Sequence, residues 1–350
     1  MGWGAPAAVV VWACTAALGA ACNSILGVDG DYVVGDPFGT SGSVTGVGGS
    51  GQGGSGQGGS GQGGSGQGGT SVADGGGGAG GGQVVLVDDQ LLLHLDAARA
   101  RNGLTPHPAG CGADALIWTD LSSTGADGIL TNFSSCDPSS GWNGAGTAAD
   151  PHRLVFRGSD DNLVDLGSDL FNGADQGTVE AWYRMDTPPT LTGDANTSGY
   201  GLLSSASTSD DGKFFAVNVF VETAADPRLN AWCRNPFDVV HGESNLPSAT
   251  WLHLAVTSDG ATTRMYVNAV EESATAIRGT DSGRWFADAV AGEMLYTIGR
   301  VRRASHSNTF IPDDSALSIL RLHGRQLSRD ELLANCQAQV ARFAGASCGP

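Results

Sequence analysis

The stretch from residue 48 to residue 82 consists almost entirely of glycine, serine and glutamine, and it repeats the pentapeptide GGSGQ four times. These side chains cannot bury enough apolar surface to offset the entropy cost of ordering the backbone. We therefore expect a flexible tether here and not a structural repeat. Any folded domain must lie beyond it, and we predict one at residues 84–345, followed by a short tail at 346–350.

The first 21 residues have the composition of an export signal. Their apolar body is shorter than the roughly 20 apolar residues that a transmembrane helix needs, so we interpret residues 1–21 as a signal peptide. The positive charge that normally opens such a signal is missing, because the first basic residue of the chain is Arg99. A misassigned start codon would account for this departure.

Cys22 follows three small residues, Gly19-Ala20-Ala21, that a signal peptidase could accept. This arrangement resembles the lipobox of bacterial lipoproteins, although Leu18 stands one position further from the cysteine than the usual leucine. The resemblance implies lipidation at Cys22, a tether that completes residues 22–83, and an outer-membrane lipoprotein that faces the periplasm or the cell surface. Ordinary secretory cleavage is the alternative, and Cys14 is a second, poorer candidate for the lipid.

The chain is strongly acidic. It has 18 Lys and Arg residues against 36 Asp and Glu residues, which gives a formal net charge of −18. Such a charge repels phosphate backbones and anionic lipid head groups. Nucleic acid is therefore excluded as a partner, whereas glycans, envelope or surface proteins and cations remain.

Beyond residue 83 the sequence changes to short apolar runs separated by Gly, Asp, Asn, Ser and Pro. Short runs rich in β-branched and aromatic residues, with turn residues between them, favour an all-β sandwich or barrel. Several runs are apolar on both faces, which favours two packed antiparallel sheets. We expect strands at residues 91–95, 153–156, 162–166, 178–185, 213–221, 250–256, 263–267, 294–298 and 316–322.

One helix is predicted near the C-terminus. Residues 328–331 read SRDE, which is the Ser-x-x-Glu spacing of a capping box. Apolar residues then recur at helical spacing, so that one stripe of the helix can dock on the sandwich. They are Leu332, Leu333, Cys336, Val340 and Phe343.

Taken in order, these segments resemble the laminin-G-like or concanavalin A-like lectin/glucanase jelly-roll family. The resemblance rests on LLLHLDA (91–97), RLVFRGSDDNLVDLG (153–167), GTVEAWYRMD (177–186), TWLHLAVTSDGATTRMYVNA (250–269) and LSILRLHGRQLSRDELLAN (317–335). It implies a two-sheet antiparallel jelly-roll sandwich with a short C-terminal helix. One departure is Ala269, where the family usually has glycine, and since alanine is unfavourable at positive φ we expect a different turn there.

Sugar binding by sandwich folds usually needs an aromatic platform with planar polar groups beside it. Trp142, Trp232 and Trp285 lie outside the best predicted core strands, so they are the candidates for ligand binding. A tryptophan that is partly buried in a loop without any ligand is the alternative for each.

The superfamily resemblance also implies that calcium is the one metal to weigh. Asp160, Asp161 and Asp259 offer oxygen ligands of suitable hardness. Aspartate is equally an ordinary turn residue, so turn formation is the competing interpretation.

Catalytic motifs are not found. Laminarinase-type relatives carry Glu-x-Asp-x-x-Glu on one strand, and this chain has no such triplet. Glu180 and Asp186 lie six positions apart, so a structural role for Glu180 is favoured. The histidines show no His-x-x-x-His spacing, and no Gly-x-Ser-x-Gly elbow occurs in a suitable context.

The chain has 7 cysteines. In an oxidising envelope Cys111 could pair with Cys136 and Cys336 with Cys348, although one sequence does not fix the connectivity. Cys233 is then left over and is expected to be a buried thiol.

From the sequence we thus expect an exported, lipid-anchored envelope protein whose jelly-roll domain binds a glycan or a protein without catalysis. A divergent glycoside hydrolase and a purely structural envelope component are the alternatives.

Overall fold

Two antiparallel sheets face each other in the computed structural model. It describes residues 86–99, 116–133, 140–168, 170–188, 199–207, 209–210, 213–221, 226–233, 238–283, 285, 292–301 and 309–349. They belong to one of two units of the chain, the unit Gly66–Pro350. The signal peptide, Cys14, Cys22, the tether, Cys111 and Cys136 lie outside the described residues.

The first sheet has eight strands. Its order is β14 (Val270–Glu272), β13 (Thr263–Val267), β12 (Leu252–Ser258), β7 (Gly177–Met185), β19 (Ser315–His323), β5 (Arg153–Phe156) and β4 (Gly141–Asn143), while β1 (Leu91–Asp96) also pairs with β19.

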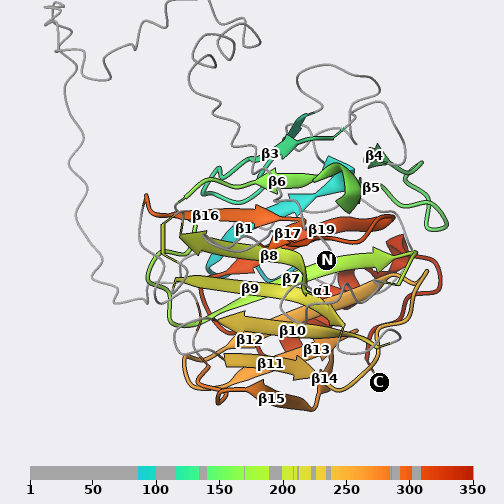
Figure 1. Cartoon of the computed structure of the whole chain (residues 1–350). Coiled ribbons are helices and arrows are strands. Elements are labelled where there is room, and N and C mark those ends of the chain that lie inside the picture. Colours follow the sequence, from blue (N-terminus) through green and yellow to red (C-terminus); the bar gives the residue numbers. More distant parts are fainter. Residues whose placement is uncertain are drawn as a thin grey trace, which may run out of the picture. The chain divides into compact units, whose positions relative to one another are not determined.

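The second sheet has nine strands and forms the front layer in Figure 1. Its order is β15 (Ala274–Arg278), β11 (Asp238–Gly242), β10 (Pro227–Cys233), β9 (Phe214–Val221), β8 (Gly199–Ser207), β16 (Met294–Ile298), β6 (Leu163–Asp165), β3 (Gly128–Thr131) and β2 (Ile117–Trp118). A separate ribbon pairs β17 (Arg300–Val301) with β18 (Thr309–Phe310).

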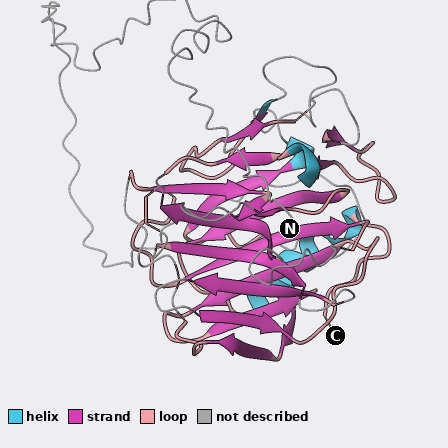
Figure 2. Ribbon diagram, viewed as in Figure 1, coloured by secondary structure: helices cyan, strands magenta, loops and turns pink. Residues whose placement is uncertain are grey.

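The helical parts are small. Short 3-10 turns occur at η1 (Ala97–Arg99), η3 (Gly158–Asp160) and η4 (Val340–Arg342), and α1 (Arg329–Gln339) is the one α-helix of the described residues. Figure 2 shows how little helix accompanies the strands. The predicted fold class, an antiparallel two-sheet sandwich with a short C-terminal helix, is confirmed.

The main hydrophobic core lies between the two sheets. Tyr183 and Leu254 contribute to it from the eight-stranded sheet, and Val217 and Tyr296 from the nine-stranded sheet. Alternation along each strand sends the intervening residues to the outer faces. The outer face of the eight-stranded sheet is covered by a second cluster, in which Trp182 packs with residues of and beyond α1.

The C-terminal helix begins at the predicted capping box. The Ser328 hydroxyl accepts a hydrogen bond from the Glu331 amide, and the Glu331 carboxylate accepts one from the Ser328 amide at 2.8 Å. A disulfide joins Cys336 to Cys348, which is the pairing expected from the sequence. The helix is therefore fixed at its start by a cap and near its end by a covalent bond.

The hairpin between β13 and β14 differs from the prediction. Val267 pairs with Val270, so the loop contains only Asn268 and Ala269, and both have positive φ (54° and 61°). These are the angles of the type I′ turn that we expected alanine to prevent. The Asn268 carbonyl accepts a hydrogen bond from the Gly349 amide at 2.6 Å, and Ala269 is fully buried, so tertiary contacts offset the unfavourable φ.

The start of the domain is tied to α1. The Val87 amide donates a hydrogen bond to Asn335 Oδ1 at 2.8 Å, and Arg342 forms a bidentate contact with Asp96 at 2.7 Å. Where the structure describes the chain, no helix has the length and apolar character needed to cross a membrane.

Candidate functional site

A polar row crosses the outer face of the nine-stranded sheet. Asn218 on β9 lies directly opposite Asn230 on β10, which lies directly opposite His241 on β11. The neighbours of these residues along each strand, such as Val217 and Ala231, point into the main core. The three polar side chains therefore project from the same outer face, on adjacent strands.

The two asparagines of this row are buried without hydrogen bonds. Asn218 and Asn230 are both 0% exposed, and neither Nδ2 nor Oδ1 of either side chain has a hydrogen-bond partner among the described parts of the chain. A buried polar group that lacks a partner costs about 1–3 kcal/mol, and native proteins seldom leave such groups. Two unsatisfied amides therefore lie side by side on adjacent strands.

Trp232 lies beside the row. It is two residues beyond Asn230 on β10, so it projects from the same face, and it packs edge-on against Phe214 with the ring centroids 5.1 Å apart. Ala216, Val239 and Val301 complete this small apolar cluster. The predicted ligand residue Trp232 thus adjoins the unsatisfied amides, although its ring is only 4% exposed.

Charged residues of both signs lie at the margins of the row. Arg228 precedes Asn230 by two residues on β10, and its buried Nε has no hydrogen-bond partner. Asp226 lies two residues before Arg228, just ahead of β10. Glu243 follows β11, and its carboxylate accepts a hydrogen bond from the Thr275 hydroxyl at 3.1 Å. Arg278 pairs with Val239 at the opposite margin.

The other two predicted ligand tryptophans lie inside the molecule. Trp142 is 6% exposed and packs edge-on against Trp118, and Trp285 is 2% exposed and packs against Phe215. Both belong to the core between the sheets. As packed here, neither ring is available to a sugar, because apolar burial is more favourable than exposure for such large rings.

The predicted calcium ligands do not converge. The Asp160 carboxylate pairs with Arg157 at 3.2 Å, and Asp161 adopts a left-handed conformation (φ 56°) at the end of η3. Asp259 caps the turn after β12, where its carboxylate accepts hydrogen bonds from the Ala261 and Thr262 amides. Among the described residues no three acidic, histidine or cysteine side chains are grouped so as to hold a metal ion. Turn formation accounts for all three aspartates.

Cys233, the cysteine left over by the predicted pairings, is buried at the end of β10. It lines a small pocket with Phe215, Asp238 and Asp281. The Asp238 carboxylate there accepts a hydrogen bond from the Thr280 amide. This position is internal and lies on the core side of the sheet.

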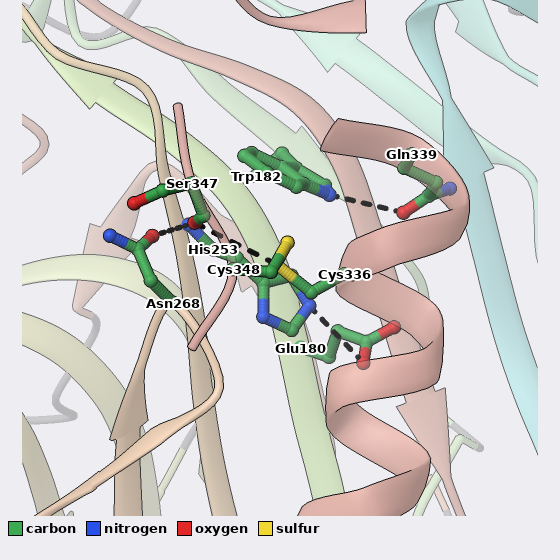
Figure 3. The surroundings of a disulfide bond; sticks show 8 residues. All are labelled: Glu180, Trp182, His253, Asn268, Cys336, Gln339, Ser347 and Cys348. Carbon is green, nitrogen blue, oxygen red and sulfur yellow. Dashed lines mark hydrogen bonds and ion pairs between the residues drawn. A yellow bond between two sulfur atoms is a disulfide. The ribbon is translucent and has the colours of Figure 1, made fainter. Parts of the chain in front are cut away.

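A second buried polar cluster lies under α1 and is centred on a paired carboxylate, although Arg321 Nε and Nη2 and His253 Nδ1 have no hydrogen-bond partner among the described residues. Glu180 on β7 is 0% exposed, and its carboxylate contacts Arg321 at 2.5 Å, His253 at 3.4 Å and the Asn335 amide at 3.1 Å. Figure 3 shows Glu180 and His253 between the sheet and the helix that carries Cys336 and Gln339. In the same layer the Trp182 indole donates to Gln339 at 3.0 Å.

The electrostatics of this second cluster are those of a structural ion pair. Burial alone would raise the pKa of Glu180, but the charges of Arg321 and His253 outweigh it and hold the pKa well below its usual range. Burial and the charge of Arg321 lower the pKa of His94 to about 3. Asp186, the other acid considered from the sequence, is exposed and pairs with Arg184 at 2.6 Å. No carboxylate pair with room for a substrate is formed here.

The fold defines a two-sheet jelly-roll domain with its polar row on the outer face of the larger sheet. Residues 157–332 match the sequence model Laminin_G_3, which is described as the concanavalin A-like lectin/glucanases superfamily. The chain belongs to this superfamily.

Solved structures with a related arrangement are distant. Domain 4 of an extracellular arabinanase from Geobacillus stearothermophilus, in complex with arabinotriose, is 14% identical with a TM-score of 0.46, over 73% of this chain and 100% of that one. The CBM40 of Ruminococcus gnavus IT-sialidase, bound to α2,3 sialyllactose, is 14% identical with a TM-score of 0.40, over 51% and 93%. Trypanosoma rangeli sialidase in complex with sialic acid is 15% identical with a TM-score of 0.38, over 73% and 34%. A search of curated proteins finds no match.

None of the three residues of the polar row was predicted as a site residue from the sequence. Asn218 lies within the predicted strand 213–221, where it is the one polar residue of the run FFAVNVFV, and that interruption was the available signal. Asn230 and His241 lie on β10 and β11, which were not among the predicted strands. Pairing between these strands is what brings the three residues together, and a single sequence does not reveal it.

Proposed function

We propose that this domain binds a glycan at the polar row, without catalysis. The observation that carries the proposal is the directly opposed pair of buried asparagines, Asn218 and Asn230, whose amide groups lack hydrogen-bond partners in the described structure. Each amide offers two N–H donors and a carbonyl acceptor. Sugar hydroxyls both donate and accept, so a glycan can satisfy both functions of each amide at once.

The surroundings of the row support a sugar over a purely apolar ligand. Ligand sites are typically apolar with a few well-placed polar groups that fix orientation. Trp232 and Phe214 supply the apolar part, and the Asn218–Asn230–His241 row supplies the polar part. Membership of a superfamily of lectins and glucanases agrees with this, although a fold by itself does not assign a function.

Binding without hydrolysis is favoured by the chemistry of the row. Retaining hydrolysis uses two carboxyl groups about 5–5.5 Å apart, and inversion uses two at about 6.5–9.5 Å. The three members of the row are two amides and an imidazole, and none is a carboxylic acid. Glu180 is committed to its ion pair under α1.

We further propose that the protein is exported and anchored through a lipid on Cys22, with residues 48–82 as a flexible tether. The support is the sequence alone: small residues before the cysteine and a glycine-rich stretch after it. Two acyl chains would suffice for stable membrane attachment. The replacement Cys22→Ser should move the protein from the membrane fraction to the soluble fraction, and continued attachment would contradict lipidation there.

The binding proposal is tested with the purified full-length protein on a glycan panel, with and without Ca²⁺. We expect retention of the wild type and of Asn245→Ala, an exposed asparagine bonded to Asp226, and loss of retention by the double variant Asn218→Leu/Asn230→Leu. Release of reducing ends would replace the binding proposal by the hydrolase alternative. Binding to no glycan would instead favour a protein ligand or a structural role.

A further inference from the structure

We infer that the outer edge of β15 is a self-association surface, on which a second copy of this chain pairs antiparallel with the first about a two-fold axis between the two Thr275 residues. This inference goes beyond the proposed glycan binding and does not depend on it. It follows from the length, the side chains and the hydrogen-bonding pattern of β15, which lies at one end of the nine-stranded sheet, at the bottom of Figure 1.

The edge strands of the two sheets differ in how well they are protected against pairing with another chain. β2 has two residues, β4 has three, and β14 has three of which two are charged, Glu271 and Glu272. Short strands and charged side chains are common protections of a sheet edge. The longer strand β1 is covered, because the Leu121 amide donates to the His94 carbonyl at 2.8 Å. By contrast β15 has five residues, and only the last, Arg278, is charged.

The backbone of β15 directs hydrogen-bonding groups away from the sheet. Its inner side pairs with β11, and no described strand pairs with its outer side. The Glu243 amide donates to the Ser273 carbonyl at 3.1 Å, so Ser273 and, two residues on, Thr275 direct their backbone groups toward β11. Ala274 and Ala276 therefore direct their N–H and C=O groups outward. Both alanines and Thr275 are exposed.

This edge is complementary to itself. A register that sets Thr275 opposite Thr275 of the second copy also sets Ala274 opposite Ala276 in both directions. The alanines carry the outward backbone groups, so each of these pairs exchanges both of its N–H···O bonds. The central threonines form a non-hydrogen-bonded pair with their Cβ atoms about 4.5–5.5 Å apart, and such Thr–Thr pairs are favourable. A self-complementary edge of this kind fits the two-fold symmetry that most homodimers have.

The charges at the two ends of β15 suit the same arrangement. Arg278 lies at the C-terminal end, whereas Glu243 and Glu272 lie at the N-terminal end. Antiparallel pairing brings Arg278 of each copy toward the acidic end of the other, and opposite charges across two strands are stabilising. Two further acids near Arg278, Asp238 and Asp281, already accept hydrogen bonds from backbone amides.

The experiment is sedimentation velocity of the full-length chain carrying Cys22→Ser, so that no lipid contributes to association. Because the net charge of −18 opposes dimerisation, the buffer contains about 150 mM NaCl to screen it. The paired edge is small, so we expect a weak dimer that forms progressively between about 1 and 500 µM.

Two substitutions at the two-fold axis test the register. Thr275→Glu and Thr275→Lys each place like charges directly opposite one another, and each should raise the dissociation constant at least about tenfold. An equimolar mixture of the two variants places opposite charges across the axis and should restore the dimer. Because unfolded chains would not reassociate in this way, the mixture also shows that both variants are folded.

The matched controls are Thr131→Glu and Thr131→Lys, since Thr131 is an exposed threonine of β3, near the opposite end of the same sheet. Both should dimerise like the parent chain. The inference is overturned by a parent chain that stays monomeric over the whole range, by a dimer that survives Thr275→Glu unchanged, or by a mixture that remains monomeric. The first of these results would leave the edge of β15 to an extended segment of another protein.

Discussion

The two sheets of this domain each carry buried polar groups on their outer faces, but these groups differ in the partners that they contact. Beneath α1, the Glu180 carboxylate is met by Arg321, His253 and Asn335. Across the nine-stranded sheet, Asn218 and Asn230 are equally buried and have no described partner. The first cluster also leaves Arg321 Nε and Nη2 without a hydrogen-bond partner in the described structure, but its buried charge is paired. A paired buried charge favours a structural role for the first cluster, whereas the unpartnered amides are the basis of the binding proposal for the second.

The largest effect is expected where a buried charge loses its partner. Replacing Glu180 by Gln removes the carboxylate and leaves Arg321 buried and unpaired, which should lower the free energy of unfolding by about 3–5 kcal/mol. Urea unfolding monitored by tryptophan fluorescence measures this. The matched control is Glu271→Gln, which removes an exposed pair with Arg264 and should change stability by less than about 1 kcal/mol. Equal effects of the two variants would show that the cluster is not structural.

The next largest effect is expected on removal of the disulfide, which should affect the side of the sandwich that carries α1 and not the polar row. Replacing Cys336 and Cys348 together by Ser should lower the free energy of unfolding by about 2–4 kcal/mol, because the bond closes a short loop against the helix. Glycan binding at the opposite sheet should persist at temperatures where the variant is folded. Loss of binding by a folded variant would mean that the two faces are coupled.

The same type of substitution, asparagine to leucine, can be made in each cluster and its effect on stability compared. Asn335→Leu removes hydrogen bonds to Glu180 and Val87 and should lower the free energy of unfolding by about 1–3 kcal/mol. Asn230→Leu replaces an unsatisfied amide by an apolar group of similar size, so it should leave stability unchanged or raise it by about 1 kcal/mol, while binding is lost. If Asn230→Leu destabilises as much as Asn335→Leu, the row is structural as well.

The last expected effect concerns pH, and it is small near neutral pH and grows as the pH falls. Because the folded pKa of His94 is about 3, against an ordinary value of 6.5, the unfolded chain binds this proton first as the pH falls. Stability is then complete above pH 6.5 and decreases below it, by up to about 1.4 kcal/mol per pH unit, until the pH reaches about 3. Urea unfolding between pH 7 and pH 4 should show a shallower decrease for His94→Phe than for the wild type. Parallel curves would remove His94 as the source.

The core strands could be predicted from the sequence because buried strands appear in it as runs of apolar residues. The runs at 178–185, 213–221 and 316–322 are mostly apolar, and the structure places strands there. The strands that frame the candidate site lack this record: β8 reads GYGLLSSAS, and β10 begins with proline and alternates polar residues. The site itself depends on register between β9, β10 and β11, which is a long-range property.

The tryptophans also show that a single sequence does not reveal which face of a sheet a side chain occupies. Trp142, Trp232 and Trp285 were singled out because they lie outside strong strand patterns. In the structure Trp142 and Trp285 fill the centre of the sandwich, and Trp232 lies on β10 beside the row. Successive side chains of a strand point to opposite faces of the sheet, so the direction of a ring depends on its position within the strand. Where the strand pattern is weak, the sequence does not show which residues share a face.

The hydrogen bond from the Val87 amide to Asn335 also fixes the place where the described chain enters the domain. The chain joins the sandwich behind the eight-stranded sheet, next to α1, whereas the polar row lies on the far side of the nine-stranded sheet. The described chain therefore enters the domain on the side away from the polar row, so that an attachment close to Val87 would leave the row uncovered.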